Sequence, residues 1–133
     1  MAEKKRSNRE TAEWVLRIAV AGEFIGHGVF AIQGKEGWFK YFEPFGITSE
    51  ETMLTILMIV GIADLLLALM VLTRPIRIGV LWMAFWGLFT AMIRWPLGGD
   101  PIWDFVERSA NWGAPLALLY LMGWPKNPKE WLK

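Results

Sequence analysis

The stretch Met53–Val71 reads MLTILMIVGIADLLLALMV and decides the fold of this chain. Asp64 is its only charged residue, and no polar face repeats every three to four residues. A helix at the surface of a soluble protein carries such a polar face. A second stretch, Ile78–Ile93, holds no charged residue at all. Both patterns therefore predict helices that are surrounded by lipid.

Two further apolar stretches flank this pair, and together they predict four transmembrane helices, at about 12–32, 51–72, 76–94 and 104–122. Each is about 20 residues long, which is the length of helix that crosses the hydrocarbon core. Pro75 separates the middle two helices, and a segment rich in Gly and Pro, 95–101, precedes the fourth. We therefore expect one all-α domain, residues 1–133, built as an antiparallel four-transmembrane-helix bundle.

Lysine and arginine residues are unevenly distributed between the two ends of these helices. The loops at one end carry Lys35, Lys40 and, at the edge, Arg94. Cytoplasmic segments are enriched in these residues, so the richer end should be cytoplasmic, with both termini there, in a multi-pass protein of the cell inner membrane. Arg17 lies near that end, where we expect its side chain to extend to the interface. The richer end carries Lys4, Lys5, Arg6, Arg9, Arg74, Arg77, Lys126, Lys129 and Lys133.

The composition excludes several classes of function. The chain has no cysteine, which excludes disulfides, thiolate metal sites and thiol redox chemistry. Its formal net charge of +1 gives no reason to expect nucleic-acid binding. His27 is the only histidine, so we expect no metal site made by this chain alone. A haem or chlorophyll with His27 as one axial ligand, and a second copy supplying another, stays open.

The first outer loop, residues 33–48, is rich in aromatic side chains but too short to span a membrane. Its centre reads GWFKYFEPFG from Gly37 to Gly46. Two interpretations are open. The loop lies in the outer interface as an aromatic belt, or it folds back over the mouth of the bundle as a lid.

Ionisable side chains in the first two helices mark a candidate site, because a charge inside the membrane is costly and needs a partner or a purpose. Glu23 and His27 lie four residues apart and so share one helix face. Asp64 lies near the middle of the second helix, where we expect it to face the bundle and not the lipid.

Further polar residues lie toward the outer ends of the last two helices. Thr90 and Arg94 share a face of the third helix, and Glu107 and Asn111 share a face of the fourth, next to Arg108. Antiparallel packing would bring these residues close to the polar residues of the first two helices.

Two interpretations of these groups are open. They form a buried ion-pair network, with Arg108 as partner of Glu23, or a polar pocket that binds a small head group or moves protons. In a pocket, His27 and Glu23 are the candidate catalytic residues. Trp86, one turn from Trp82, either stacks on an aromatic ligand or packs in the core. The predicted ligand-binding residues are Glu23, His27, Asp64, Trp86, Arg94, Glu107, Arg108 and Asn111.

Glycines indicate where helices approach closely. Gly22 and Gly26 form a GxxxG pattern in the first helix, which we expect to pack against a helix of the same chain rather than a second copy. Gly61, Gly79 and Gly87 predict close contacts in the next two helices.

Several segments together carry a resemblance to a known family. They are Gly22–Gly28 (GEFIGHG), Gly37–Trp38 with the aromatic loop after it, Gly61–Leu65 (GIADL), Leu72–Pro75 (LTRP), Thr90–Gly99 (TAMIRWPLGG) and Glu107–Leu116 (ERSANWGAPL). The chain resembles the DoxX-like family of small four-helix membrane proteins. The resemblance implies a four-helix fold and a respiratory or redox neighbourhood. Some members of that family are subunits of thiosulfate:quinone oxidoreductase, others look like accessory parts of membrane oxidoreductase or stress complexes, and eukaryotic relatives include a receptor-assembly chaperone.

We therefore expect a DoxX-like membrane subunit that binds a quinone or a similar lipid-soluble ligand in an oxidoreductase complex. No cofactor motif is visible in the chain, so any electron transfer requires partner subunits. Two alternatives stay open: a non-catalytic assembly or structural subunit, and a transporter of a small solute or protons. The sequence does not decide whether the chain is itself an enzyme.

Overall fold

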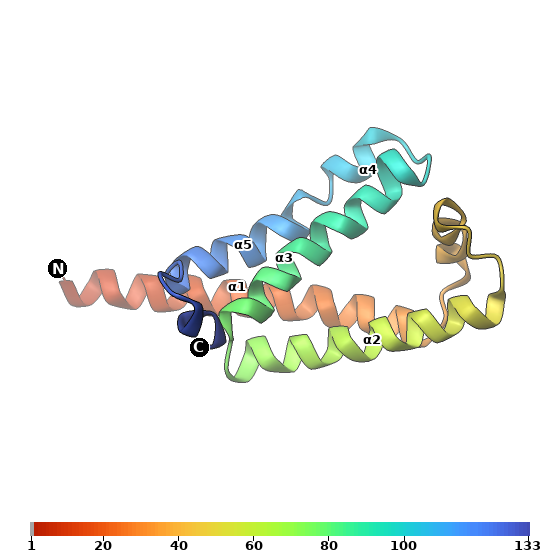
Figure 1. The fold of residues 1–133 in the computed structure, drawn as a ribbon. Coiled ribbons are helices and arrows are strands. Elements are labelled where there is room, and N and C mark those ends of the chain that lie inside the picture. The colour runs from red at the N-terminus through yellow and green to blue at the C-terminus, as the bar shows by residue number, and fades with distance from the viewer. Residues whose placement is uncertain (1) are drawn as a thin grey trace.

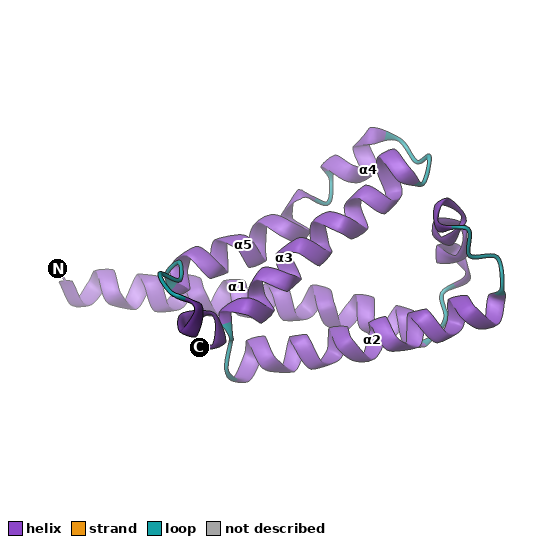
Figure 2. Ribbon diagram, in the orientation of Figure 1, coloured by secondary structure: helices purple, strands orange, loops and turns teal. Residues whose placement is uncertain are grey.

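The computed structural model describes the backbone of residues 2–133 and the side chains of residues 7–133. Its regular elements are helices, with no strand in this described part (Figures 1 and 2). The basic side chains of Lys4, Lys5 and Arg6, used above to orient the chain, lie outside the described side chains. In chain order the elements are α1 Ala2–Ile32, the 3-10 helix η1 Glu36–Phe45, α2 Glu50–Thr73, α3 Arg77–Met92, the π-helical turn η2 Ile93–Leu97, α4 Ile102–Val106, α5 Ser109–Met122 and the 3-10 helix η3 Pro128–Leu132.

Three helical segments in the described residues are long and apolar enough to cross a membrane. They are Ser7–Ile32, Glu50–Thr73 and Arg77–Leu97. Large apolar side chains on their outer surfaces are exposed, as a lipid environment requires; Ile59 is 63% exposed and Phe85 is 53% exposed. The lengths and surfaces of these helices are therefore those of a membrane protein.

The fourth helix expected from the sequence is broken into α4 and α5. At the break, Arg108 has φ −93° and ψ 12°, and its backbone N–H donates to the carbonyl of Phe105, three residues earlier, at 3.1 Å. The hydroxyl of Ser109 donates to the carbonyl of Val106 at 2.7 Å, in competition with the regular backbone pattern. The prediction of one continuous helix over 104–122 was therefore wrong at its outer end.

The helices form two pairs that diverge from one end of the molecule. α1 packs along α2 and α3 packs along α5, while α2 and α3 meet mainly near the turn that joins them (Figure 1). Near the two chain ends all four helices share one core. Its fully buried members include Val20 of α1, Val71 of α2, Met83 of α3 and Leu118 of α5. At the opposite end the pairs separate, and η1 lies between them (Figure 1).

Close approaches within each pair occur at glycines. A Cβ on Gly61 of α2 would lie 2.7 Å from the carbonyl oxygen of Gly28 in α1, and one on Gly87 of α3 would overlap the carbonyl oxygen of Asn111 in α5. The close contacts predicted at Gly61 and Gly87 are thus confirmed. Gly22 and Gly26 have no such neighbour within 4 Å, so the expected packing of this GxxxG pattern inside the chain was wrong.

Arg17 also departs from expectation, because its side chain turns inward. It is 8% exposed, and its guanidinium donates to the carbonyls of Val71 at 2.7 Å and Leu72 at 2.8 Å, at the C-terminal end of α2. These carbonyls have no donor within their own helix. The predicted extension of Arg17 to the interface was therefore wrong, since the end of α2 offers it acceptors.

Candidate ligand-binding pocket

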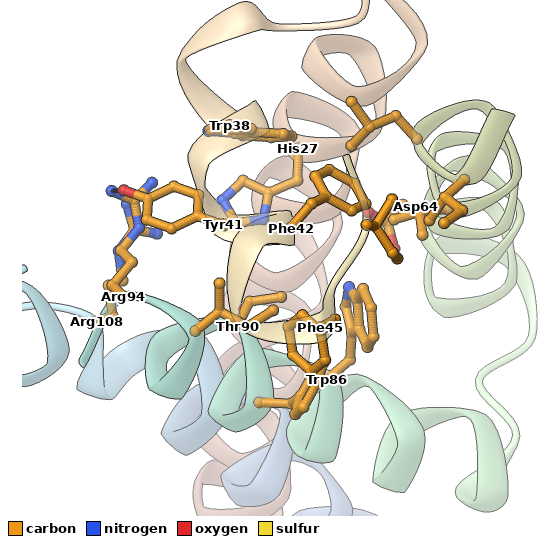
Figure 3. Close-up of a pocket in the computed structure, with 16 residues that line it drawn as sticks. His27, Trp38, Tyr41, Phe42, Phe45, Asp64, Trp86, Thr90, Arg94 and Arg108 are labelled. Carbon is orange, nitrogen blue, oxygen red and sulfur yellow. Dashed lines mark hydrogen bonds between the residues drawn. The ribbon is translucent and has the colours of Figure 1, made fainter. Parts of the chain in front are cut away.

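A cavity of about 290 Å³ lies where the two helix pairs diverge. Its walls come from α1 and α2 on one side and from α3 and η2 on the other, and η1 closes it from the open end (Figure 3). Most of the lining is apolar or aromatic. The lining residues are His27, Trp38, Tyr41, Phe42, Phe45, Ile47, Ile56, Leu57, Val60, Asp64, Trp86, Phe89, Thr90, Ile93, Arg94 and Arg108.

η1 contributes a row of aromatic side chains to this cavity. In a 3-10 helix residues three apart align, so Trp38 with Tyr41 and Phe42 with Phe45 form two neighbouring rows, and all four line the cavity. Gly46 ends η1 with a left-handed backbone (φ 70°), and its N–H donates to the carbonyl of Glu43 at 2.9 Å. Of the two interpretations of this loop, the structure shows the one in which it folds back over the bundle mouth.

Aromatic contacts connect η1 to both walls. The ring of Trp38 lies edge-on to the imidazole of His27, with centroids 5.8 Å apart. The ring of Phe45 lies 6.2 Å from that of Phe89 in α3. Phe89 in turn lies 5.6 Å from Trp86, so aromatic rings form a continuous surface along the α3 side of the cavity. Such a surface suits a flat or chain-like apolar molecule.

Trp82 and Trp86, which the sequence could not tell apart, have different positions. Their rings are stacked, with centroids 5.8 Å apart and an angle of 16° between the planes. Trp86 lines the cavity, whereas Trp82 is 47% exposed on the outer surface of α3. The two side chains therefore provide a matched pair, one inside the cavity and one outside it.

Polar groups gather at one side of the cavity. Arg94 of η2 donates from Nη1 to the hydroxyl of Tyr41 at 3.0 Å, and Arg108 lies close enough to Arg94 to interact with it electrostatically. Figure 3 shows both guanidinium groups beside the Tyr41 ring, with His27 next in the lining. Asp64 of α2 lies across the cavity from them, is 3% exposed and has no hydrogen-bond partner among the described residues. It faces the bundle interior, as expected.

An ion-pair network outside the spans fixes η1 to the loop before α4. Tyr41 donates from its hydroxyl to Asp100 Oδ2 at 2.7 Å, and Lys40 donates from Nζ to Asp100 Oδ1 at 3.0 Å. These two hydrogen bonds lower the pKa of Asp100, and the bond to Asp100 raises the pKa of Lys40. Burial and the bond to Asp100 raise the pKa of Tyr41. Around neutral pH the network thus consists of a carboxylate, an ammonium and a neutral phenol.

No family model, curated protein or solved structure matches this chain. The resemblance to DoxX-like proteins stays a prediction from sequence motifs. The geometry of the cavity must therefore carry any proposal about function.

Five of the eight predicted ligand-binding residues line the cavity, namely His27, Asp64, Trp86, Arg94 and Arg108. They come from α1, α2, α3, η2 and the break between α4 and α5, and the depth of each in its expected helix was the signal that predicted their meeting.

The other three predicted residues lie elsewhere. Glu23 is half-buried and is not in the lining; Arg108 acts on it electrostatically, but no hydrogen bond or ion pair joins the two among the described residues. Glu107 is exposed and Asn111 is half-buried, because the break between α4 and α5 ends the regular spacing that was expected to put both on one face.

Sequence reasoning missed the contacts of Tyr41 with Arg94 and Asp100. Tyr41 belongs to the aromatic loop that was singled out as a whole, but nothing in its spacing distinguished it from Phe39 or Phe42. Its hydroxyl was the available signal, since a phenol in an apolar setting needs a hydrogen-bond partner.

Proposed function

We propose that this chain is a four-span protein of the cell inner membrane, with both termini cytoplasmic, and that the cavity binds a lipid-soluble ligand. Three spans are α1, α2 and α3 with η2. The fourth is the broken pair α4–α5, whose combined length from Ile102 to Met122 corresponds to about 30 Å of helix. The orientation rests on the lysines and arginines beside both chain ends and the α2–α3 turn, which lie at one end of the molecule (Figure 1).

The observation that carries the ligand proposal is the aromatic cavity between the diverging helix pairs, with polar donors at one side. An apolar cavity with a few convergent polar groups is the usual form of a small-molecule site. A quinone fits this chemistry. Its ring can lie along Trp86 and Phe89, and its carbonyl oxygens can accept hydrogen bonds from Arg94 or His27.

The role of the chain in the cell follows from the same chemistry together with the DoxX-like resemblance. We propose that it serves as a ligand-binding subunit of a respiratory or redox complex. Because the chain has no cysteine and no cofactor motif, electrons would reach a bound quinone from a partner subunit. His27, in the cavity lining, and the half-buried Glu23, on the same helix face, are the candidate groups for proton exchange in that role.

The stacked tryptophans provide the test. Protein purified in a mild nonionic detergent would be extracted and its bound quinone measured, and Trp86→Ala would be compared with Trp82→Ala. We expect Trp86→Ala to lose at least about tenfold in quinone affinity, because an aromatic contact and its buried area are lost. Trp82→Ala should retain the affinity of the wild type, because Trp82 does not line the cavity. Equal quinone content in the two variants, or none in the wild type after reconstitution with added quinone, would contradict the proposal.

A further inference from the structure

Two arginines, Arg94 and Arg108, lie together at the polar side of the cavity. The charged side chains that act electrostatically on His27 are all cationic, namely Arg108, Arg94 and Lys35. Arg94 and Arg108 also act on each other, which means that two like charges lie close together beside an apolar cavity. Two cations do not gather in such a place without a compensating negative charge.

The carboxylates around these arginines, including Asp64 in the same cavity lining, form no hydrogen bond or ion pair with either guanidinium among the described residues. Asp100 is held by Tyr41 and Lys40. Glu107 and Asp104 lie within electrostatic range of Arg108, and Arg108 acts on Glu23, but none of the three forms an ion pair or hydrogen bond with Arg108 among the described residues. The positive charge at the cavity is thus not neutralised by direct contacts of the protein.

Both arginines also have guanidinium N–H donors without an acceptor in the described residues. The Nε atom of Arg108 is buried and has no hydrogen-bond partner in residues 7–133. The Arg94 guanidinium makes one hydrogen bond in the described structure, to the hydroxyl of Tyr41, and its other N–H groups are free to bind elsewhere. A buried guanidinium N–H without an acceptor is costly, and oxyanions are the acceptors that guanidinium groups bind best.

We infer that Arg94 and Arg108, which both line the cavity, form a seat for the oxyanion head of an amphiphilic ligand, whose apolar body lies along the aromatic surface of η1 and α3. The inference rests on the proposed function and narrows it. The two arginines would favour, among lipid-soluble molecules, those that carry a carboxylate, phosphate, sulfate or ionised ring hydroxyl. A neutral quinone would fill the apolar part and leave the charge of the seat unmatched.

A pair of naphthoquinones of nearly equal shape tests this selection. A 2-hydroxy-3-alkyl-1,4-naphthoquinone is an anion at neutral pH, because its hydroxyl and the C4 carbonyl form a vinylogous carboxylic acid, whereas the 2-methyl-3-alkyl compound is neutral. Dissociation constants for both would be measured with the full chain in nonionic detergent. We expect the anion to bind about tenfold to a hundredfold more tightly than the neutral compound, which is the range of a charge-assisted hydrogen bond.

Variants assign the preference to the two arginines. Arg94→Gln and Arg108→Gln should each reduce the anion-to-neutral preference to about threefold or less, because the anion loses a charge-assisted hydrogen bond whereas the neutral compound loses at most an ordinary one. Arg74→Gln is the charge-matched control, because Arg74 is exposed in the α2–α3 turn and should keep the full preference. Glu23→Gln should keep or increase it, because removal of a nearby negative charge leaves Arg108 more available to an anion; a loss equal to that of Arg108→Gln would overturn the seat.

The remaining outcomes separate this inference from the proposed function. If neither naphthoquinone binds, the cavity does not hold a lipid-soluble ligand, and both the proposed function and the oxyanion seat are contradicted. If the two compounds bind equally well to the wild type, only the oxyanion seat is overturned, and that comparison needs no variant to fold. If inorganic sulfate binds as tightly as the anionic naphthoquinone, the two arginines bind a free oxyanion, and the inference of an amphiphilic ligand is contradicted.

Discussion

Arginine side chains bind the exposed carbonyls of helix ends near the two chain termini. Arg17 donates to the last turn of α2, Arg77 donates from Nε to the carbonyl of Gly123 at 2.8 Å just after α5, and Arg9 donates to the carbonyl of Leu121. The C-terminal end of a helix carries a partial negative charge and carbonyls without donors. A membrane protein cannot leave such carbonyls to lipid, so these arginines stabilise the fold where the helices are packed most closely.

Replacement of Arg17 by Met should destabilise the protein by about 2–3 kcal/mol, because two charge-assisted hydrogen bonds are lost and buried carbonyls stay without donors. Thermal unfolding in detergent would measure the change. Arg74→Met is the control, since Arg74 is exposed and should alter the unfolding temperature little. An Arg17→Met protein as stable as the control would show that the end of α2 does not need this donor.

Replacement of Gly87 by Ala should separate α3 from α5, since its new Cβ would overlap the carbonyl oxygen of Asn111. We expect a loss of about 2–3 kcal/mol from this overpacking. Gly22→Ala is the matched control: nothing lies within 4 Å of its Cβ, and alanine is the better helix former by about 1 kcal/mol. Denaturant unfolding should thus rank Gly22→Ala at or above the wild type, and an equal loss in both variants would contradict the packing described at Gly87.

The side-chain positions that could be predicted from the sequence were those fixed only by the free-energy cost of placing a charge in the membrane. Asp64 had to face inward, because a carboxylate in hydrocarbon is unfavourable wherever the neighbouring helices lie. The inward turn of Arg17 depends on where α2 ends beside α1, and the open space beside Gly22 depends on which face of α1 meets α2. Both are properties of packing, which helices that are apolar on all sides do not encode in their spacing.

At the scale of elements, η1 is a short aromatic helix with a glycine of positive φ on each side. Gly34 has φ 66° and Gly46 has φ 70°, and both lie outside the helix itself. The element is joined to the rest of the molecule by the apolar contacts of its inner face and by the bonds of Tyr41 and Lys40 to Asp100. These bonds close the cavity at its open end, so their strength should control access to it.

Tyr41→Phe should loosen η1, because it removes the hydrogen bonds to Asp100 and from Arg94 while keeping the ring. The loss of about 1–1.5 kcal/mol should increase the exposed population by about fivefold to tenfold. The chain has no cysteine, so Phe42→Cys can report access through its rate of labelling by a small maleimide. Thr48→Cys, outside the cavity lining and exposed, should be labelled at the same rate with or without Tyr41→Phe. Unchanged labelling of Phe42→Cys would show that the network does not restrain η1.

The same network should be insensitive to pH across the neutral range. The pKa of Asp100 is lowered. Its contribution to the stability of the network is therefore fully present above its ordinary pKa and is lost only as the pH falls through the lowered value. The pKa values of Lys40 and Tyr41 are raised, so their contribution as proton donors persists as the pH rises toward those values. The ratio of labelling rates at Phe42→Cys and Thr48→Cys should thus stay constant between about pH 5 and pH 9. A severalfold change in this ratio would mean that another group controls the lid.

Helix positions were predicted well where breakers are strong and less well where they are weak. Pro75 lies in the turn before α3, as expected, and Ser49 caps α2 by accepting from the N–H of Thr52. The break before Ser109 has no glycine or proline to announce it. The hydroxyl of Ser109 bonds locally to the carbonyl of Val106 at this break, and a serine inside a helix is too common in sequences to locate a break.

At the scale of the whole molecule, the packed core and the cavity occupy opposite ends. The buried cluster around Val20, Val71 and Met83 holds four helices together near the chain termini. Past it the pairs diverge, and the space between them is filled by η1 and the cavity. The sequence predicted which residues would be at similar depths, but it could not predict that the bundle opens, because uniformly apolar helices give no indication of the angle between pairs.

Cysteine labelling in oriented vesicles would decide between four spans and three. Thr48, between η1 and α2, and Lys126, after α5, are both exposed. With four spans, an impermeant maleimide should label Thr48→Cys from outside, and should label Lys126→Cys and Arg74→Cys only after permeabilisation. If α4 and α5 do not cross, only three segments span the membrane. Lys126→Cys should then be labelled from outside, like Thr48→Cys, whereas Arg74→Cys should still require permeabilisation.

This comparison tests the broken fourth span separately from the overall orientation. α5 alone has 14 residues, or about 21 Å of helix, which is shorter than the hydrocarbon core of about 30 Å. A four-span result therefore requires α4 to complete the crossing, with Arg108 at the break, beside the cavity and inside the membrane. Labelling of Lys126→Cys from outside would instead place Arg108 in a surface segment, where water can satisfy its guanidinium, and would remove the need for an oxyanion partner.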